Sequence, residues 1–143
     1  MKKVSDILAR KGSIPVAVPP STCVIDALKL MADKNIGSVL IMEEGQFLGI
    51  MTERDYSRKV ILKGKSSTDT GVAEIMTTEF PRVSSSDTIE HCMELMSART
   101  LRYLPVFENE SLVNIISMSD VVKETILGQE ETITQLKDYL HAM

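Results

Sequence analysis

The chain has 143 residues, with 16 Lys and Arg against 20 Asp and Glu, and its formal net charge of -4 disfavours non-specific binding to nucleic acid. Its 43% of hydrophobic and 25% of charged residues are typical of a folded globular domain and argue against disorder. No apolar run approaches the roughly 18 residues that span a bilayer, and two cysteines suit a reducing compartment, so we expect a cytoplasmic protein without nucleic-acid or membrane partners.

The sequence repeats itself. A shift of 65 residues aligns two stretches without a gap, so that Thr52 coincides with Ser117 and Asp55 with Asp120, while near the start of each half the shift is 68. Because internal repeats decide the architecture, we interpret the chain as two copies of one unit. The predicted boundaries are a first repeat over 1–63, a linker over 64–71, a second repeat over 72–128 and a C-terminal amphipathic helix over 129–143.

The first copy predicts the element order β-α-β-β-α. We expect a strand over 15–18, then a helix whose apolar face carries Val24, Ala27, Leu28 and Met31 at helical spacing. A hairpin of strands over 38–42 and 47–51 follows, closed by a tight polar turn. The last helix of the unit begins after Thr52.

The second copy predicts the same order. A short strand over 82–84 precedes a helix with Ile89, Cys92, Met93 and Met96 on its apolar face, and Asp87 with Glu90 matches a capping box at its start. A hairpin over 103–107 and 111–116 leads into a helix that begins after Ser117 and ends at Gly128. Two such units give a mixed α/β (α+β) fold with approximate two-fold symmetry and two clefts between the halves.

Beyond Gly128, one stripe of the predicted C-terminal helix is apolar. Ile133, Leu136 and Leu140 recur at helical spacing along it. The stripe suits docking either on the body of the protein or on a second subunit.

A hydroxyl residue and an acidic residue meet at two equivalent points, Thr52 with Asp55 and Ser117 with Asp120. A helix start leaves backbone N–H groups unpaired and carries the positive end of the helix dipole, which favours a phosphate. A carboxylate three residues later can accept hydrogen bonds from the vicinal hydroxyls of a ribose. The same spacing is that of an ordinary helix N-cap, and the duplication does not decide between cap and ribonucleotide site.

Together these features resemble a tandem cystathionine-β-synthase (CBS) domain pair, or Bateman module, over residues 4–127. The resemblance is carried by Gly49-Ile50-Met51-Thr52-x-x-Asp55, Ile115-Ile116-Ser117-x-x-Asp120, Val72-x-x-Ile75-Met76-Thr77 and Leu104-Pro105-Val106. The run from Thr52 to Lys59, followed by Gly64-Lys65-Ser66-Ser67, is similar to a stand-alone bacterial and plant subgroup.

The resemblance implies adenosine ligands (AMP, ADP, ATP, NAD(H) or S-adenosylmethionine) in clefts between the repeats, and a flat homodimer. By that analogy one site uses Thr52, Arg54 and Asp55, with an adenine wall from Val83, Arg102, Tyr103 and Pro105. The other site uses Ser117 and Asp120, with a wall from Val16, Ala17, Gly37 and Ser38.

The two implied sites differ in composition. Arg54 corresponds to Ser119, so only the first site gains a guanidinium, and we expect it to bind phosphorylated adenosines more tightly. Asn114 stands where the first copy has Gly49. If that glycine serves close approach of the ligand, the second site is narrower or differently selective.

The function expected is therefore a regulatory module, not an enzyme, that senses adenine nucleotides, for example as an energy sensor, and signals to a partner in trans. The alternative is a ligand-independent dimeric interaction scaffold. We expect no catalytic residues, because His91 and Cys92 are adjacent and lie on different helix faces, and Cys92 reads as a core residue. We expect no metal site, because Cys and His lack ligand spacing.

Overall fold

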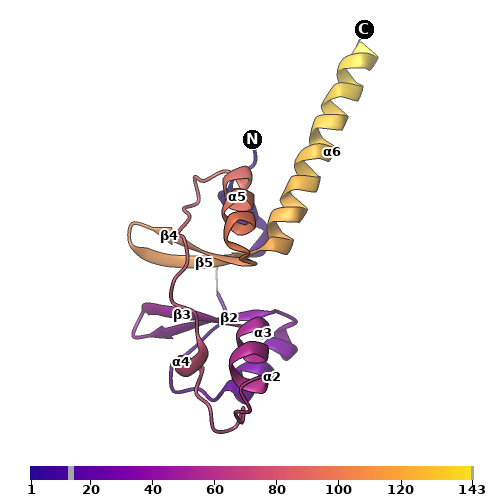
Figure 1. The fold of residues 1–143 in the computed structure, drawn as a ribbon. Coiled ribbons are helices and arrows are strands. Elements are labelled where there is room, and N and C mark those ends of the chain that lie inside the picture. The colour runs from indigo at the N-terminus through magenta and orange to yellow at the C-terminus, as the bar shows by residue number, and fades with distance from the viewer. Residues whose placement is uncertain (13–14, 143) are drawn as a thin grey trace. The chain divides into compact units, whose positions relative to one another are not determined.

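The computed structural model describes residues 1–12 and 15–142, and the chain forms two compact units (Figure 1). Unit 1 comprises Met1–Ile14 and Pro81–Met143, and unit 2 comprises Pro15–Phe80. Each sequence repeat thus gives its leading helix to the unit that contains the other repeat's strands. The compact units therefore divide the chain differently from the repeat boundaries predicted at 1–63 and 72–128.

Unit 2 is a three-stranded sheet with helices packed on it. Its strands are β1 (Ala17–Val18), β2 (Ser38–Glu43) and β3 (Gln46–Thr52) in the order β1-β2-β3, with β1 parallel and β3 antiparallel to β2. Its helices are α2 (Val24–Lys34), α3 (Glu53–Tyr56), which continues as the π-helical segment η1 (Ser57–Ile61), and α4 (Val72–Ile75). Buried apolar side chains from these elements form one core, with Val24, Ala27, Met31, Val39, Ile41 and Met51 among them.

Unit 1 has the same plan with one strand fewer. Its helices are α1 (Val4–Lys11), α5 (Ile89–Arg99) and α6 (Met118–Ala142), and its strands β4 (Tyr103–Glu108) and β5 (Ser111–Ser117) pair antiparallel. The expected strand over 82–84 is reduced to one parallel bridge between Val83 and Val106. The core gathers buried side chains from every helix and strand of the unit, with Val4, Ile7, Ile89, Met96, Leu104 and Ile116 among them.

The structure confirms the repeat at a shift of 65 residues. Helix α2 spans 24–34 and α5 spans 89–99, and each ends at a left-handed residue, Asn35 and Thr100. Both hairpins turn through two residues with positive φ, Glu44-Gly45 and Asn109-Glu110, the geometry whose twist suits a two-residue hairpin. The sequence resemblance between the halves is therefore a resemblance of backbone conformation.

Two predicted details around the first helix of the second copy are wrong. The N-cap of α5 is Thr88, whose hydroxyl accepts from the His91 N–H at 3.1 Å. Asp87 instead accepts from the Ser84 N–H at 2.7 Å, which braces the preceding turn. Met93, predicted on the buried face, is 37% exposed, because the buried side of α5 is set by Ile89, Cys92 and Met96.

The prediction that a helix ends at Gly128 is wrong. It runs without interruption from Met118 to Ala142, so the predicted C-terminal helix over 129–143 is its continuation. A glycine within a helix is tolerated at a cost when neighbouring residues favour the helix. The predicted linker is held against α2, since the N–H groups of Val24 and Ile25 donate to the carbonyls of Thr70 and Ser67 at 2.8 and 3.0 Å.

Candidate functional site

The first hydroxyl–carboxylate pair lies in unit 2, where β3 passes into α3. The Thr52 N–H donates to Asp55 Oδ2 at 2.9 Å, and the Asp55 N–H donates back to Thr52 Oγ1 at 3.1 Å. This reciprocal pattern is a capping box, which satisfies two backbone donors at the helix start. The N-cap interpretation of the motif is thus confirmed for this copy.

The Asp55 carboxylate is fully engaged within unit 2. Besides the Thr52 N–H, its Oδ2 accepts from the Thr52 hydroxyl at 3.1 Å, while Oδ1 accepts from the Thr77 hydroxyl and pairs with Lys59 Nζ, both at 2.9 Å. Its side chain is only 9% exposed. Since a carboxylate offers about four acceptor positions, all of them are used by protein donors.

The second pair lies in unit 1, where β5 passes into α6, and it is less completely engaged. The Ser117 N–H donates to Asp120 Oδ2 at 2.8 Å, and the Asp120 N–H donates to Ser117 Oγ at 3.1 Å. Lys11, from α1, donates to the same Oδ2 at 2.8 Å. Among the residues that the structure describes, none donates to Asp120 Oδ1, and the side chain is 20% exposed.

Electrostatics keep the second carboxylate ionised. Burial acts to raise the pKa of Asp120, but the hydrogen bond and charge of Lys11, together with the hydrogen bonds from Ser117, outweigh it and hold the pKa below its usual value of 3.8. At neutral pH, Asp120 is therefore an anionic acceptor beside an ammonium group.

The unpaired N–H groups expected at each helix start are largely used by the protein. In unit 2 the Glu53 N–H donates to the Gly37 carbonyl at 3.1 Å, and in unit 1 the Met118 N–H donates to the Arg102 carbonyl at 2.8 Å. With the capping boxes, three of the first N–H groups of each helix already have acceptors. A phosphate at either helix start would therefore depend mainly on side-chain cations and less on free backbone N–H groups.

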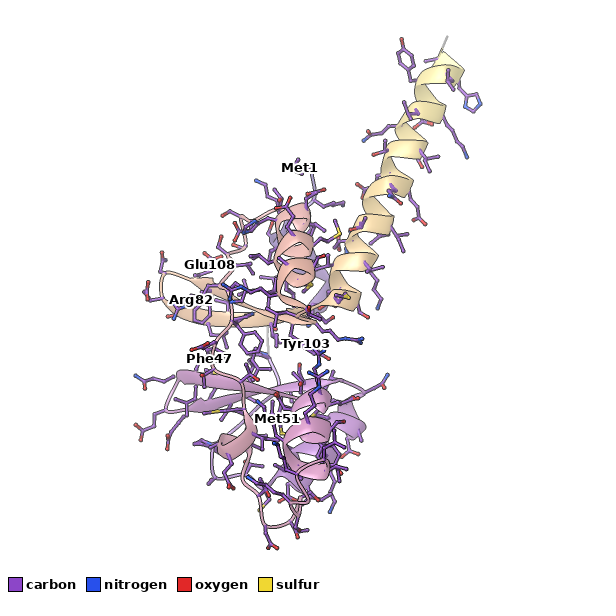
Figure 2. The ribbon with its side chains drawn as sticks, viewed as in Figure 1. Met1, Phe47, Met51, Arg82, Tyr103 and Glu108 are labelled. Carbon is purple, nitrogen blue, oxygen red and sulfur yellow. The ribbon has the colours of Figure 1, made fainter. Side chains whose placement is uncertain are left out.

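The predicted wall residues lie in or next to the strands of the two units. In unit 2, Ser38 pairs with Thr52 across the β2–β3 ladder, and Gly37 precedes it. In unit 1, Tyr103 at the start of β4 (Figure 2) pairs with Ser117. The structure thus brings Gly37 and Ser38 to Thr52, and Arg102 and Tyr103 to Ser117, each within one unit. The pairing of each helix start with the other copy's wall stays a prediction.

The remaining predicted residues fall in or near the same sheets. Ala17 pairs with Leu40 on β1, and the Val16 carbonyl accepts from the Leu40 N–H at 3.0 Å. Pro105 is buried opposite Ile115 in the hairpin of unit 1, next to the Val83–Val106 bridge. Arg54 is exposed in the first turn of α3.

Gly49 has a structural reason to be glycine. An added Cβ would lie 2.9 Å from both Met76 Sδ and the Thr77 carbonyl, where the leading segment of the second repeat crosses β3. At the equivalent place in unit 1, Asn114 is buried and donates from Nδ2 to the Gly12 carbonyl at 3.0 Å. The interpretation of Gly49 as a site of close ligand approach is therefore replaced by contact with the protein's own backbone.

Sequence reasoning missed Thr77 and Lys11 as partners of the two carboxylates. Lys59 lies four residues after Asp55 on one helical segment, so its ion pair follows from helix spacing. Thr77 was visible only as part of a family motif, and Lys11 lies 109 residues from Asp120 in sequence. Only the packing of α1 in unit 1 brings Lys11 to that carboxylate.

Other classes of site find little support in the described residues. Burial, with a smaller contribution from Asp87, raises the pKa of Cys92 to about 11, so its thiol is a poor nucleophile. Over residues 1–12 and 15–142, no three His, Cys, Asp or Glu side chains gather as a metal site, and no helix is both long and apolar enough to cross a bilayer.

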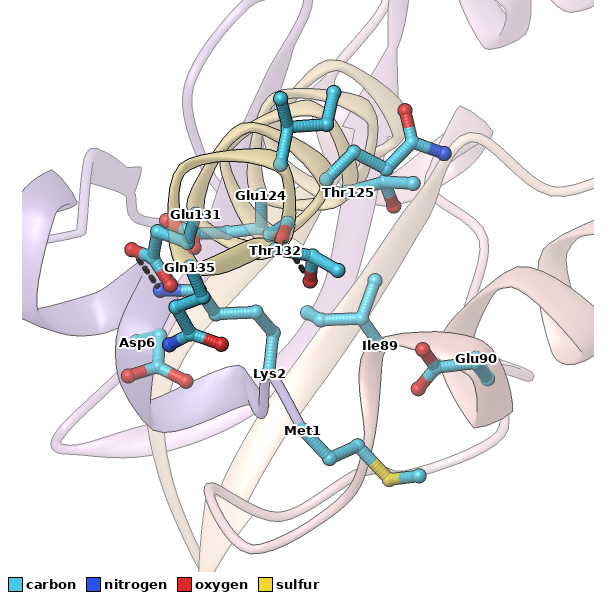
Figure 3. A pocket seen from close by; sticks show the side chains of 13 residues that line it. Met1, Lys2, Asp6, Ile89, Glu90, Glu124, Thr125, Glu131, Thr132 and Gln135 are labelled. Atoms are coloured by element: carbon cyan, nitrogen blue, oxygen red, sulfur yellow. Dashed lines mark hydrogen bonds and ion pairs between the residues drawn. The ribbon is translucent and has the colours of Figure 1, made fainter. Parts of the chain in front are cut away.

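Among the cavities formed by the described residues, two lie beside these elements. One, of about 790 Å³ in unit 1, is lined by Lys2, Asp6, Glu90 and Glu124 among others and contains none of the predicted site residues (Figure 3). The other, of about 520 Å³ in unit 2, lies between α2 and α3 and includes Gly37. Neither cavity contains Asp55 or Asp120.

Comparison with known proteins gives one consistent family. The CBS domain family model matches residues 4–61 and 72–126. The CBS domain-containing protein CBSX3, mitochondrial, of Arabidopsis thaliana is 31% identical over 96% of this chain and 71% of its own length. The structure of a putative signal-transduction protein with CBS domains from Burkholderia ambifaria MC40-6 is 40% identical, with a TM-score of 0.85 over 90% of this chain and 96% of that one.

A second similar structure holds ligands. It is the CBS domain pair of protein MJ0100 in complex with 5′-methylthioadenosine and S-adenosyl-L-methionine, with a TM-score of 0.77 and 23% identity over 91% of this chain and 98% of that one. At this identity the likeness is one of fold.

Proposed function

We propose, from the premise that this chain belongs to the CBS domain family, that it is a regulatory module. The module binds an adenosine derivative at its two helix starts, Thr52/Asp55 and Ser117/Asp120, and catalyses no reaction. One observation carries the proposal. At a helix start, Asp120 Oδ2 accepts from the Lys11 ammonium at 2.8 Å, while none of the described residues donates to its Oδ1. A carboxylate accepts hydrogen bonds from vicinal ribose hydroxyls, and a neighbouring ammonium attracts a phosphate or another anionic group.

The ligands that fit this arrangement share an adenosine and differ in what the 5′ carbon carries. AMP, ADP, ATP and NAD(H) carry phosphates, while S-adenosylmethionine carries a carboxylate and a cationic sulfur. The ligands of the MJ0100 complex, 5′-methylthioadenosine and S-adenosyl-L-methionine, support an adenosine as the common element. In this proposal Val16, Ala17, Gly37 and Ser38 form the adenine wall of the Ser117/Asp120 site, and Val83, Arg102, Tyr103 and Pro105 that of the Thr52/Arg54/Asp55 site.

The hydrogen bonds weigh against the expectation that the Thr52/Asp55 site is the tighter of the two. The Asp55 carboxylate already accepts from four protein donors, and the Asp55 side chain is only 9% exposed. A ribose must therefore displace Thr77 or Lys59 before it can bind. Asp120 needs no such exchange at Oδ1. We therefore propose that the first equivalent of ligand binds at Ser117/Asp120, while Arg54 improves only the second binding event.

The remaining parts of the proposal concern partners. We propose a homodimer that passes ligand occupancy to an unidentified protein in trans, which requires that the ligand bind two conformations with different affinity. Both cysteines are free thiols, which agrees with action in a reducing compartment such as the cytoplasm.

A second candidate function is a ligand-independent interaction scaffold. The observation that favours it is the saturation of Asp55, whose hydrogen bonds give it a structural role that needs no ligand. Under this alternative the protein acts through its dimer surface, and the two hydroxyl–carboxylate pairs serve only as capping boxes of their helices.

A thermal-shift panel of AMP, ADP, ATP, NAD, NADH and S-adenosylmethionine separates the two candidates. A ligand at about 100 times its dissociation constant adds roughly 2.7 kcal/mol of stability. The expected result is a shift with at least one compound that Asp120→Asn abolishes and that the exposed control Asp33→Asn keeps. No shift with any compound overturns the sensing proposal and favours the scaffold.

A further inference from the structure

The last helix, α6, carries an apolar stripe whose side chains are about half exposed. Its members are Val122, Ile126, Ile133, Leu136 and Leu140, with exposed fractions of 49, 48, 51, 58 and 66%. The stripe follows a heptad pattern, in which Ile126, Ile133 and Leu140 occupy one core position (a) and Val122, Gln129 and Leu136 the other (d). The family model ends at residue 126, so most of this stripe lies beyond the residues that the model matches.

A neighbouring face of α6 packs on unit 1. Val121 and Glu124 are buried, and Lys2 pairs with Glu131 at 3.0 Å. Lys2, Glu124 and Glu131 line the cavity of unit 1 (Figure 3), and Gln129 lies at its edge as well. Figure 1 shows the second half of α6 extending away from α1 and α5. Of the stripe, Ile133 also lines that cavity, whereas Val122, Ile126, Leu136 and Leu140 do not.

We propose that this stripe pairs with the same stripe of a second copy of the chain, as a short antiparallel coiled coil. In an antiparallel pair, an a residue of one helix faces a d residue of the other. The pairing that we infer sets Ile133 against the partner's Leu136 and Leu140 against the partner's Gln129. Two-fold symmetry repeats both contacts, so the centre of the interface consists of Ile133 and Leu136 from each chain.

Charges beside the stripe select this orientation and register. Glu130 and Lys137 occupy the same flanking heptad position (e), and e positions face each other across an antiparallel pair. In the inferred register, Glu130 faces the partner's Lys137 on both edges, which gives two attractive pairs. Sliding the helices by one heptad sets either Glu130 against the partner's Glu130 or Lys137 against the partner's Lys137, so both neighbouring registers are repulsive.

A parallel pair lacks this complementarity. There, e positions face g positions, and the g residues of α6 are Thr125, Thr132 and Tyr139, none of which carries the opposite charge. Charge complementarity thus favours a second copy in the antiparallel arrangement.

Charge reversal tests the inference on the full-length chain, without ligand, so that its outcome is independent of the proposed nucleotide binding. Lys137→Glu turns both attractive pairs into repulsive ones and should weaken self-association about tenfold or more in sedimentation equilibrium. Glu130→Lys combined with Lys137→Glu restores attraction and should restore association. The control Asp138→Lys makes the same charge change as Glu130→Lys on the opposite face of the helix and should leave association unchanged.

Other outcomes contradict specific parts of the inference. An effect of Lys137→Glu that the double variant does not reverse rejects the proposed register, and strengthened association places Lys137 near a cation such as the partner's Lys123. If Leu136→Glu leaves self-association intact, or if the unmodified chain is a monomer at every concentration, the stripe is not a self-pairing surface. Because Leu136 is 58% exposed, its replacement should not disturb folding, which circular dichroism checks.

Discussion

The Thr77 hydroxyl donates a hydrogen bond to Asp55 Oδ1 at 2.9 Å, and the two residues come from different sequence repeats. Asp55 caps the last helix of the first repeat, whereas Thr77 follows the leading helix of the second repeat, α4. The adjacent backbone bonds between Ile50 and Thr77, both at 2.9 Å, join the same segment to β3. This junction fastens the exchanged leading segment to unit 2.

Replacing Thr77 tests the strength of this junction. Thr77→Val removes the donor to a nearly buried carboxylate and should lower the free energy of unfolding by about 1–3 kcal/mol. Thr77→Ser keeps the hydroxyl and should recover most of the loss. Urea unfolding provides the measurement, with Thr78→Val as the matched control. Equal losses at Thr77 and Thr78 would show that the hydrogen bond contributes nothing specific.

The two carboxylates should respond differently to ligand. Because no residue in the described part of the chain donates to Asp120 Oδ1, whereas Asp55 has four protein donors, Asp120→Ala should weaken binding of the first AMP equivalent about 10-fold to 100-fold, the range for a hydrogen bond to a charged group. Asp55→Ala should mainly lower stability, because it leaves the Thr52 N–H and the Thr77 hydroxyl without their acceptor and removes the ion pair of Lys59. Isothermal titration calorimetry and urea unfolding separate the two effects. An equal loss of AMP affinity in both variants argues against the proposed order of binding.

The sequence predicted what depends on local pattern and on duplication. The 65-residue shift reproduces helix bounds, left-handed helix ends and hairpin turns, since each follows from residues close together in the chain. The hydroxyl–carboxylate spacing predicted both helix starts, and it also allowed the capping box that the structure contains.

Long-range packing accounts for what the sequence did not predict. The exchange of leading helices places Lys11 beside Asp120 and Thr77 beside Asp55, and no periodicity encodes either contact. The prediction of a helix end at Gly128 was wrong for a related reason. A glycine that follows an apolar helical pattern is typical of a helix end, but here the flanking residues continue the helix and Lys2 packs close to the position.

Two glycine substitutions should have opposite signs. Gly49→Ala places a Cβ 2.9 Å from the Thr77 carbonyl, so the crossing segment must move and the unfolding free energy should fall by about 1–3 kcal/mol. Gly128→Ala lies within α6, where the nearest contact is the flexible Lys2 side chain at 3.3 Å, and should raise it by up to about 1 kcal/mol. Thermal and urea unfolding of both variants provide the comparison. Destabilisation by Gly128→Ala would indicate that the glycine is needed for packing against Lys2.

The two cysteines should differ in reactivity. Cys92 is buried with its pKa raised to about 11, whereas Cys23 is partly exposed. Because the thiolate is the reactive form, a thiol-specific reagent at pH 8 should modify Cys23 and leave Cys92 until the protein unfolds. Mass spectrometry of the native and the urea-treated protein, with Cys23→Ser as control, counts the modified thiols. Rapid modification of Cys92 in the native protein contradicts a rigid core around α5.

Acid should remove the stabilisation that Asp120 provides. Its pKa in the folded protein lies below the usual 3.8, since Lys11 and Ser117 outweigh the effect of burial. A carboxyl group with a lowered folded pKa stabilises the protein above its unfolded pKa and loses that contribution as pH falls through the folded value. The difference in unfolding free energy between the wild type and Asp120→Asn should therefore be constant near neutral pH and shrink below about pH 4. Both partners are partly exposed, so the ion-pair contribution itself should be about 1 kcal/mol or less.

Lys11→Met should move the Asp120 pKa upward, which carboxyl NMR titration measures directly. An unchanged titration in Lys11→Met would show that the ion pair between α1 and α6 does not form in solution.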